Sequence, residues 1–171
     1  MKLYQYKFIF FMAIDWVHEL LVSGRLLVAF LLGAVIGWER EHHGQEAGIR
    51  TFGLISLGAC SFGLLSIFVE YGDQGRIAAQ IVSGIGFLGA GVIMQHGGHI
   101  KGITTAATIW CSAAVGTAIA FDMYVIGILT ATIILLFHAL RNTKYWSLVS
   151  NKKIQKDKDS GEIIVKDNGH K

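Results

Sequence analysis

Apolar residues run through this 171-residue chain in five long blocks, which short polar stretches separate. A helix needs about 20 mostly apolar residues, within a range of about 17–25, to cross the hydrocarbon core of a membrane. The blocks that reach this length are Leu20–Trp38, Thr51–Val69, Ile77–Met94, Ile103–Phe121 and Met123–Leu140. The pattern therefore predicts an all-α, polytopic membrane protein with about five transmembrane helices. Little more than Asp122 separates the last two blocks, so we expect a tight antiparallel hairpin there.

Composition and charge divide the chain into three parts. Hydrophobic residues make up 53% of the sequence and charged residues only 16%, and the mean hydropathy is +0.50, as in membrane proteins. We expect an interfacial N-terminal segment over residues 1–19, a transmembrane domain over residues 20–140, and a basic, mostly disordered cytoplasmic tail over residues 141–171. The sequence carries no recognised nucleic-acid-binding motif. We therefore expect the lipid bilayer as a partner and expect no binding to nucleic acid.

The distribution of positive charge predicts the orientation of the helices. If five helices cross the membrane, the loops 39–50 and 95–102 share one side with the C-terminal tail, and that side carries most of the Arg and Lys residues. Because cytoplasmic loops carry an excess of these residues, we expect an outside N-terminus and a cytoplasmic C-terminus. This orientation fails if the short apolar run Phe8–Ile14 also crosses. Arg25, near the outer end of the first block, is expected to snorkel to the headgroups.

Small residues recur at helix-contact spacing in the first, third and fourth blocks. Membrane helices associate through such residues because small side chains let two backbones approach closely. The glycines predicted to pack helices are Gly33, Gly37, Gly84, Gly86, Gly89, Gly91 and Gly116. The spacing does not separate contacts within one chain from contacts in a homo-oligomer, and it leaves open a glycine-lined substrate path.

The segment GWEREHHGQEAGIRT, Gly37–Thr51, holds the main charged cluster near the expected membrane surface. Two interpretations stay open. Glu39 and Glu41 could pair with Arg40 and Arg50, or they could offer oxygen ligands to Mg²⁺, which binds one or two carboxylates and keeps several waters. Two carboxylates without ligands from elsewhere form a weak metal motif.

Polar residues also mark the third block. Asp73 is placed to cap this helix by accepting hydrogen bonds from its first backbone N–H groups, and Arg76 is placed to pair with Asp73 three positions away. Gln80 lies one turn further in. A polar amide inside a membrane needs a partner and often marks function, so Gln80 either bonds another helix or contacts a substrate.

Threonines open the fourth block at Thr104, Thr105 and Thr108. Their hydroxyls can bond back to their own helix or across to Gln80 and Ser83. If a polar path crosses the membrane, we expect it between the third and fourth helices.

Motifs for enzymatic chemistry are missing from the sequence. It contains no nucleophile elbow, phosphate loop or zincin motif, and its one formal GxGxxG, from Gly84 to Gly89, lies inside an apolar block with no preceding strand. The loop histidines His42, His43, His96 and His99 could form a metal or pH-sensing site, although nothing in the sequence fixes their geometry. We therefore expect no enzyme and no cofactor other than Mg²⁺.

Three sequence blocks, in this order and spacing, resemble the MgtC/SapB family of bacterial membrane proteins. They are GWERE with AGIRT (Gly37–Glu41, Ala47–Thr51), DQGRIAAQIVSGIGFLGAGVI (Asp73–Ile93) and KGITTAATIWCSAAVG (Lys101–Gly116). The resemblance covers roughly residues 20–140. It implies a multi-pass protein of the bacterial inner membrane, with about five helices, an outside N-terminus and a cytoplasmic C-terminus.

The resemblance also implies functional residues. Carried over by position, they are Glu39, Arg40, Glu41, Arg50, Thr51, Asp73, Arg76, Gln80, Gly86, Gly89, Gly91, Thr105 and Cys111. Some members have Asn where this chain has Thr104. A role that needs the Asn side-chain amide is therefore not carried over to this chain. Longer members add a soluble C-terminal domain that resembles a ligand-sensing fold, and its function is not transferred to this short chain.

The family is associated with adaptation to low magnesium, with acid or phagosomal stress, and with virulence. The resemblance thus implies a membrane protein that supports magnesium homeostasis or stress adaptation by regulating other membrane proteins, among them the ATP synthase. The alternative is a transporter of Mg²⁺ or another small cation or solute, with its path near Gln80, Ser83, Thr104 and Thr108.

Overall fold

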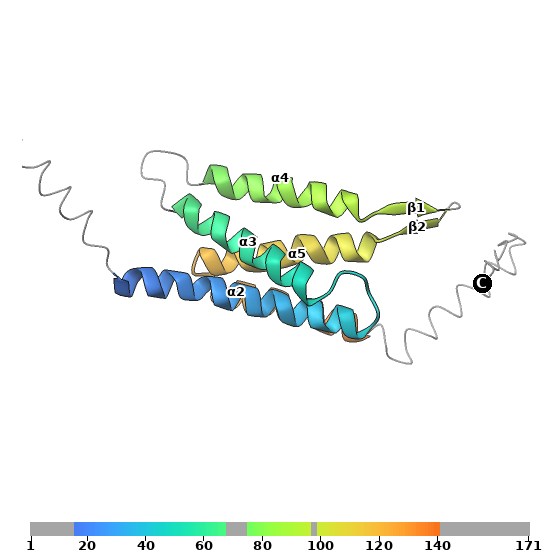
Figure 1. Ribbon diagram of the computed structural model, residues 1–171, viewed down its shortest axis with the longest axis horizontal. Helices are drawn as coiled ribbons and strands as arrows, with labels where there is room; N and C mark the ends of the chain where they lie inside the picture. The colour runs from blue at the N-terminus through green and yellow to red at the C-terminus, as the bar shows by residue number, and fades with distance from the viewer. Residues whose placement is uncertain (1–15, 68–74, 97–98, 141–171) are drawn as a thin grey trace, which may run out of the picture. The chain divides into compact units, whose positions relative to one another are not determined.

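The computed structural model describes residues 16–67, 75–96 and 99–140. In these ranges it has five helices and one two-stranded hairpin (Figure 1). The elements are α2 (Trp16–His42), α3 (Ile49–Ile67), α4 (Gly75–Gly91), β1 (Met94–His96), β2 (His99–Lys101), α5 (Ile103–Ala120) and α6 (Tyr124–Leu140). The run Phe8–Ile14, the predicted cap Asp73 and the tail 141–171 lie outside the described residues.

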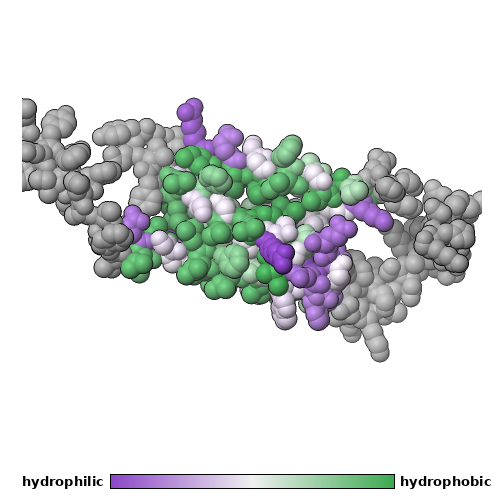
Figure 2. All heavy atoms as spheres, in the orientation of Figure 1, coloured by the Kyte–Doolittle hydropathy of each residue, from purple (hydrophilic) through white to green (hydrophobic). Residues whose placement is uncertain are grey.

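The helices have the length and composition of a membrane protein. Within the described residues, α2 (from Glu19), α3 and α5 are long and apolar enough to cross a bilayer, and α6 is a shorter apolar helix of 17 residues. Large apolar side chains point outward, with Phe87 81% exposed and Val125 79% exposed, and the face in Figure 2 is mostly apolar over the helices. The prediction of an all-α, polytopic membrane protein is confirmed.

The chain divides into two compact units, Met1–Leu135 and Leu136–Lys171. Of the second unit, the structure describes only the last residues of α6, Leu136–Leu140. The contacts below all lie within the first unit.

Glycines bring α2, α3 and α5 into backbone contact. A Cβ added at Gly33 would lie 2.7 Å from Ser56 Cβ, and one at Gly37 would lie 2.6 Å from Ile49 Cα. A Cβ at Gly116 on α5 would lie 2.8 Å from the Ser56 carbonyl carbon. Since real Cβ atoms do not approach so closely, these three glycines hold α3 against both neighbours within one chain. The core between them includes buried Ile36, Phe52, Ile109 and Val115.

The helix α4 packs more loosely against α3 and α5. Its one buried residue is Gly89, where an added Cβ would lie 3.7 Å from Ala106 Cβ on α5. In the described part of the chain, nothing lies within 4 Å of a Cβ added at Gly84, Gly86 or Gly91. These three predicted packing glycines therefore make no close contact with another described helix.

The connection between α5 and α6 is a tight turn. Asp122 has a positive φ of 60°, the Met123 N–H donates to the Ala118 carbonyl at 2.9 Å, and the Asp122 N–H donates to the Ile119 carbonyl at 3.4 Å. These two bonds form a Schellman motif, the usual end of a helix at a left-handed residue. Asp adopts this conformation more readily than most residues other than Gly.

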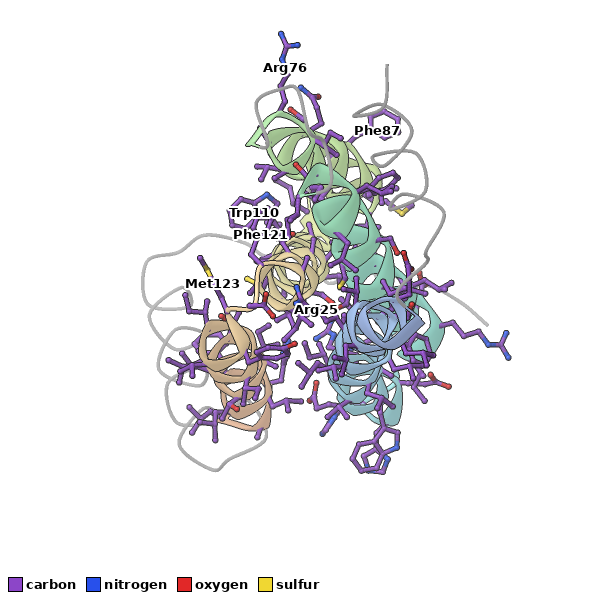
Figure 3. All side chains as sticks on the ribbon, turned by 90° about the vertical axis from the view of Figure 1, so that its left-hand side faces the viewer. Arg25, Arg76, Phe87, Trp110, Phe121 and Met123 are labelled. Carbon is purple, nitrogen blue, oxygen red and sulfur yellow. The ribbon has the colours of Figure 1, made fainter. Side chains whose placement is uncertain are left out.

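Arg25 of α2 contacts this turn, an interaction that the sequence did not predict. Its Nη2 lies 2.8 Å from Asp122 Oδ1 and its Nη1 donates to the Ala120 carbonyl at 2.9 Å. Figure 3 shows Arg25 extending from α2 toward α5. An ion pair and a carbonyl at the helix end thus give the guanidinium two partners within the chain.

The loop predicted after the third block contains a short hairpin instead. Strand β1 pairs antiparallel with β2, with Met94 opposite Lys101 and His96 opposite His99. The two residues between the strands are both glycine in the sequence, which favours such tight connections. Gly102, with a φ of 90°, then starts α5.

Candidate functional site

Polar and charged side chains gather where α2 ends, α3 begins and α5 begins. We call Glu39, Arg40, His43, Gln45 and Thr105 the junction cluster. The chain turns at Gly44, which has a φ of 69°. The Gly44 N–H donates to the Glu41 carbonyl at 3.0 Å and the Gln45 N–H donates to the Arg40 carbonyl at 3.1 Å, again a Schellman motif. The turn therefore folds Gln45 back toward Arg40.

Arg40 is the centre of the junction cluster. It is only 2% exposed. Its Nη2 donates to Gln45 Oε1 at 3.0 Å and to Thr105 Oγ1 at 2.9 Å, although Thr105 is 65 residues away in the sequence. A buried charge is costly unless hydrogen bonds compensate for the lost water. These two bonds therefore join α2, the turn after it and the first turn of α5.

Glu39 has one oxygen paired and one free. Its Oε1 lies 3.1 Å from His43 Nδ1, and the same nitrogen lies 2.8 Å from the Glu39 carbonyl oxygen. Its Oε2 is buried and has no hydrogen-bond partner among the described residues. The Glu39 side chain is 15% exposed. This oxygen can accept a hydrogen bond or a proton.

Glu41 stabilises the start of α3. Its Oε2 accepts a hydrogen bond from the Ile49 N–H at 3.1 Å, where a negative charge also interacts favourably with the helix dipole. Arg50 is exposed. The expected ion pairs from Glu39 and Glu41 to Arg40 and Arg50 are thus replaced by other contacts: Glu39 pairs with His43, and Glu41 bonds the backbone of α3.

The two glutamates do not form a metal centre together. They are two positions apart on α2, and such residues do not face each other on a helix. Within the described ranges, no group of three or more His, Cys, Asp or Glu side chains could hold a metal ion. The described residues therefore add no His, Cys, Asp or Glu ligand that would complete a Mg²⁺ site with Glu39 and Glu41.

The predicted polar path between α4 and α5 is not assembled. Ser83 and Thr104 are exposed, and Gln80 is exposed in a groove that α4 forms with α3 and not with α5. Thr108 is buried, but its Oγ1 donates to the Thr104 carbonyl of its own helix at 2.8 Å. The remaining threonine, Thr105, belongs to the junction cluster. The side chains named for the path therefore do not converge.

The other predicted site residues lie apart from the junction cluster. Thr51 is exposed at the start of α3, Arg76 is exposed at the start of α4, and Cys111 is a half-buried free cysteine beside the core. Gln45 and the contact from Glu39 to His43 were not predicted from the sequence. Gly44 in the sequence indicates the turn that positions His43 and Gln45. The partners of these two side chains follow only from the folded chain.

Comparisons with known proteins find a matching family model and similar curated proteins. A family model described as the MgtC family matches residues 26–144. Protein MgtC of Salmonella typhimurium (strain LT2) is 52% identical over 111 residues, which are 65% of this chain and 48% of that protein. Protein MgtC of Brucella abortus (strain 2308) is 56% identical over 90 residues, 52% of this chain and 37% of that protein.

An uncharacterized protein of Synechocystis is 50% identical over 104 residues, 60% of this chain and 43% of that protein. The chain thus matches about half the length, or less, of these curated relatives. No solved structure matches.

Proposed function

This chain belongs to the MgtC family, and from that premise we propose that it is a non-enzymatic membrane protein that supports magnesium homeostasis or stress adaptation by regulating other membrane proteins. Its proposed setting is the bacterial inner membrane, with the N-terminus outside and the C-terminus in the cytoplasm. The excess of Arg and Lys on one side supports this orientation. The ATP synthase is one candidate partner.

The junction cluster carries this proposal. Its buried guanidinium at Arg40 is used to join helices, and its hydrogen bonds run to Gln45 and Thr105. A conducting site would instead turn its polar groups toward a continuous path. We call these two hydrogen bonds of Arg40 the brace, because they hold α2, the turn after it and α5 together. Such a fixed arrangement fits a protein that presents a fixed surface to a partner.

The packing of the helices supports a regulator as well. Backbone contact at Gly33 and Gly37 brings α2 close to α3 and its first turn. Gly116 likewise brings α5 into backbone contact with α3. A hydrated cation needs room and polar groups along its way. In the described bundle, close backbone contact at α3 leaves no room for such a cation at these glycines, and the side chains expected to line a path beside α4 do not converge.

The surface around the junction cluster supplies the contact region that we propose for the partner. Glu41, His42 and Arg50 are exposed at the end of the helices where α2 passes into α3. Charged side chains at such a membrane face can pair with a partner's charges without disturbing the buried brace beneath them. Electrostatic complementarity of this kind gives specificity more than affinity.

The proposal is tested by complementation in a bacterial host whose own family member is deleted, grown at limiting magnesium. The full chain is expected to restore growth. Thr105→Val, which removes one of the two side-chain acceptors described for Arg40, is expected to abolish this rescue at equal membrane abundance, whereas Thr105→Ser, which keeps a hydroxyl, retains it. Thr104→Val changes an exposed neighbour and serves as the matched control. Full rescue by Thr105→Val would contradict a functional role of the brace.

A partner is sought in the same cells by cross-linking through a photoreactive residue placed at Glu41 or at Arg50. A specific cross-linked membrane protein is expected at these positions, and none at Leu129, which is exposed on α6. Rescue without a specific cross-link at either position would contradict regulation through this surface.

A further inference from the structure

An open apolar groove lies between α3 and α4. It has a volume of about 620 Å³ and includes Leu54, Gly58 and Phe62 of α3 with Ile77, Gly84 and Leu88 of α4 in its walls. This volume lies within the range of about 300–1,000 Å³ that is usual for small-molecule sites. All the lining side chains are apolar except Gln80.

Glycines open this groove. Gly58 and Gly84 lie in its opposite walls, and nothing in the described chain comes within 4 Å of a Cβ added at either position. Elsewhere in the fold glycines draw helices together, as at Gly33 and Gly116. Here they widen the space between two helices instead, so a narrow apolar ligand can enter.

Polarity changes along the groove in one direction. Gln80 lies in the wall toward the start of α4, and Arg76 lies one helical turn before it on the same face. Arg76 is exposed, and Figure 3 shows it extending away from the bundle. Beyond Gln80, from Ile81 to Leu88, the lining of α4 is entirely apolar. The groove thus has an exposed arginine beside its end, one amide in its wall after Ile77, and only apolar residues beyond.

A phospholipid has the complementary order of groups. Its phosphate is anionic, its ester carbonyl accepts hydrogen bonds, and its acyl chain is apolar. Along α4 the groove runs from Ile77 to Leu88, about 16 Å at 1.5 Å per residue. This length is close to half of the roughly 30 Å hydrocarbon core of a bilayer, which is the depth that one acyl chain occupies in one leaflet.

We propose that the groove between α3 and α4 binds one acyl chain of an anionic phospholipid, with the lipid phosphate within reach of Arg76 and an ester carbonyl accepting from the Gln80 amide. A helix from a second copy is a worse fit, because a helix with its side chains is about 10–12 Å across and needs a larger volume over the same length. Charge complementarity selects an anionic headgroup.

The first test uses the full chain in nanodiscs that contain phosphatidylglycerol with a photoreactive diazirine in its acyl chain. After irradiation, mass spectrometry of the digested protein is expected to find adducts concentrated on the groove residues. Gly84→Leu fills the groove and is expected to reduce these adducts about tenfold, equivalent to a loss of about 1.4 kcal/mol in binding.

Gly86→Leu is the matched control for the groove. Gly86 is two residues away on α4, does not line the groove, and likewise has nothing within 4 Å of an added Cβ. It is expected to leave the adducts unchanged, and helix content by circular dichroism shows that both variants fold. Adducts spread evenly over exposed positions such as Val125 would mean bulk lipid only and would overturn the proposal. Protein–protein cross-links at the groove would overturn it in favour of a second copy.

The second test concerns the headgroup. The wild-type chain is expected to label more strongly with the phosphatidylglycerol probe than with phosphatidylcholine carrying the same diazirine chain. Arg76→Gln is expected to remove this difference. Arg50→Gln, which changes an exposed arginine away from the groove, is expected to preserve it. Equal labelling by both probes in the wild-type chain would overturn the assignment of an anionic lipid.

Discussion

At the scale of single residues, Arg40 connects three parts of the chain, which are α2, the turn after it and the first turn of α5. Its guanidinium is buried and bonds the side chains of Gln45 and Thr105. Removing one partner of a buried donor costs more than the bond itself contributes, because the donor is then left without the water that it lost on folding. The stability of this junction therefore depends on both acceptors.

Thr105→Val is expected to lower the free energy of unfolding by about 1–3 kcal/mol. Thr105→Ser keeps an acceptor for Arg40 and is expected to lower it by less. Thermal unfolding in detergent, followed by circular dichroism, measures both variants. Thr104→Val, at an exposed position, is the reference, and an equal loss in Thr104→Val and Thr105→Val would show that the bond to Arg40 contributes nothing.

The sequence predicts Arg40 as a site residue but not its partners. Its place in GWERE marks a charged group at the end of an apolar block, and elementary charge pairing then favours a carboxylate as its partner. The fold instead supplies a neutral amide through the turn at Gly44 and a hydroxyl from a helix 65 residues away. No spacing in the sequence encodes such a contact, because it depends on how α5 packs beside α2.

At the scale of elements, the glycines divide into two kinds that the sequence does not separate. Gly33, Gly37 and Gly116 touch backbone across helix interfaces, whereas Gly84 and Gly86 face open space. Both kinds occur in apolar blocks with small residues around them. The helices themselves were predictable, because the length of an apolar block suffices to place a membrane helix. The short hairpin after α4 was not, because its strands are only three residues long.

Gly116→Ala and Gly86→Ala are expected to have opposite effects on stability. The added methyl at Gly116 would collide with the backbone of Ser56, and overpacking of this kind costs about 1–3 kcal/mol. At Gly86 the methyl meets nothing, and the higher helix propensity of Ala contributes up to about 1 kcal/mol. The midpoint of thermal unfolding in detergent distinguishes them. A tolerated Gly116→Ala would mean that α3 and α5 are not in contact at this level.

The turn between α5 and α6 allows its backbone and charge contributions to be separated. Asp122→Asn keeps a residue suited to positive φ but removes the ion pair with Arg25. Since the Asp122 side chain is 58% exposed, we expect a loss of only about 0.2–1 kcal/mol. Asp122→Val adds the strain of a β-branched residue at a φ of 60° and is expected to cost about 1–2 kcal/mol more. Chemical denaturation in detergent gives both values, and equal losses would contradict a contribution from the backbone conformation.

At the scale of the whole molecule, the described part of the first unit combines a closely packed core of α2, α3 and α5 with α4, which is attached more loosely. The core of α2, α3 and α5 is held by glycine contacts and by the junction cluster. The helix α4 leaves an open groove against α3. This division fits a protein whose core presents a fixed surface to a partner while α4 meets the lipid, and it does not fit a pathway through the centre of the described bundle.

The central claim, that this protein acts without carrying magnesium, is tested most directly by Mg²⁺ flux into sealed proteoliposomes. The purified chain is reconstituted with a trapped Mg²⁺-sensitive dye, with and without a membrane potential, after its folding and insertion have been checked. Our account predicts a flux equal to that of protein-free vesicles under both conditions. Saturable flux that Gln80→Leu abolishes and Gly86→Leu preserves would contradict it and would make the protein a transporter.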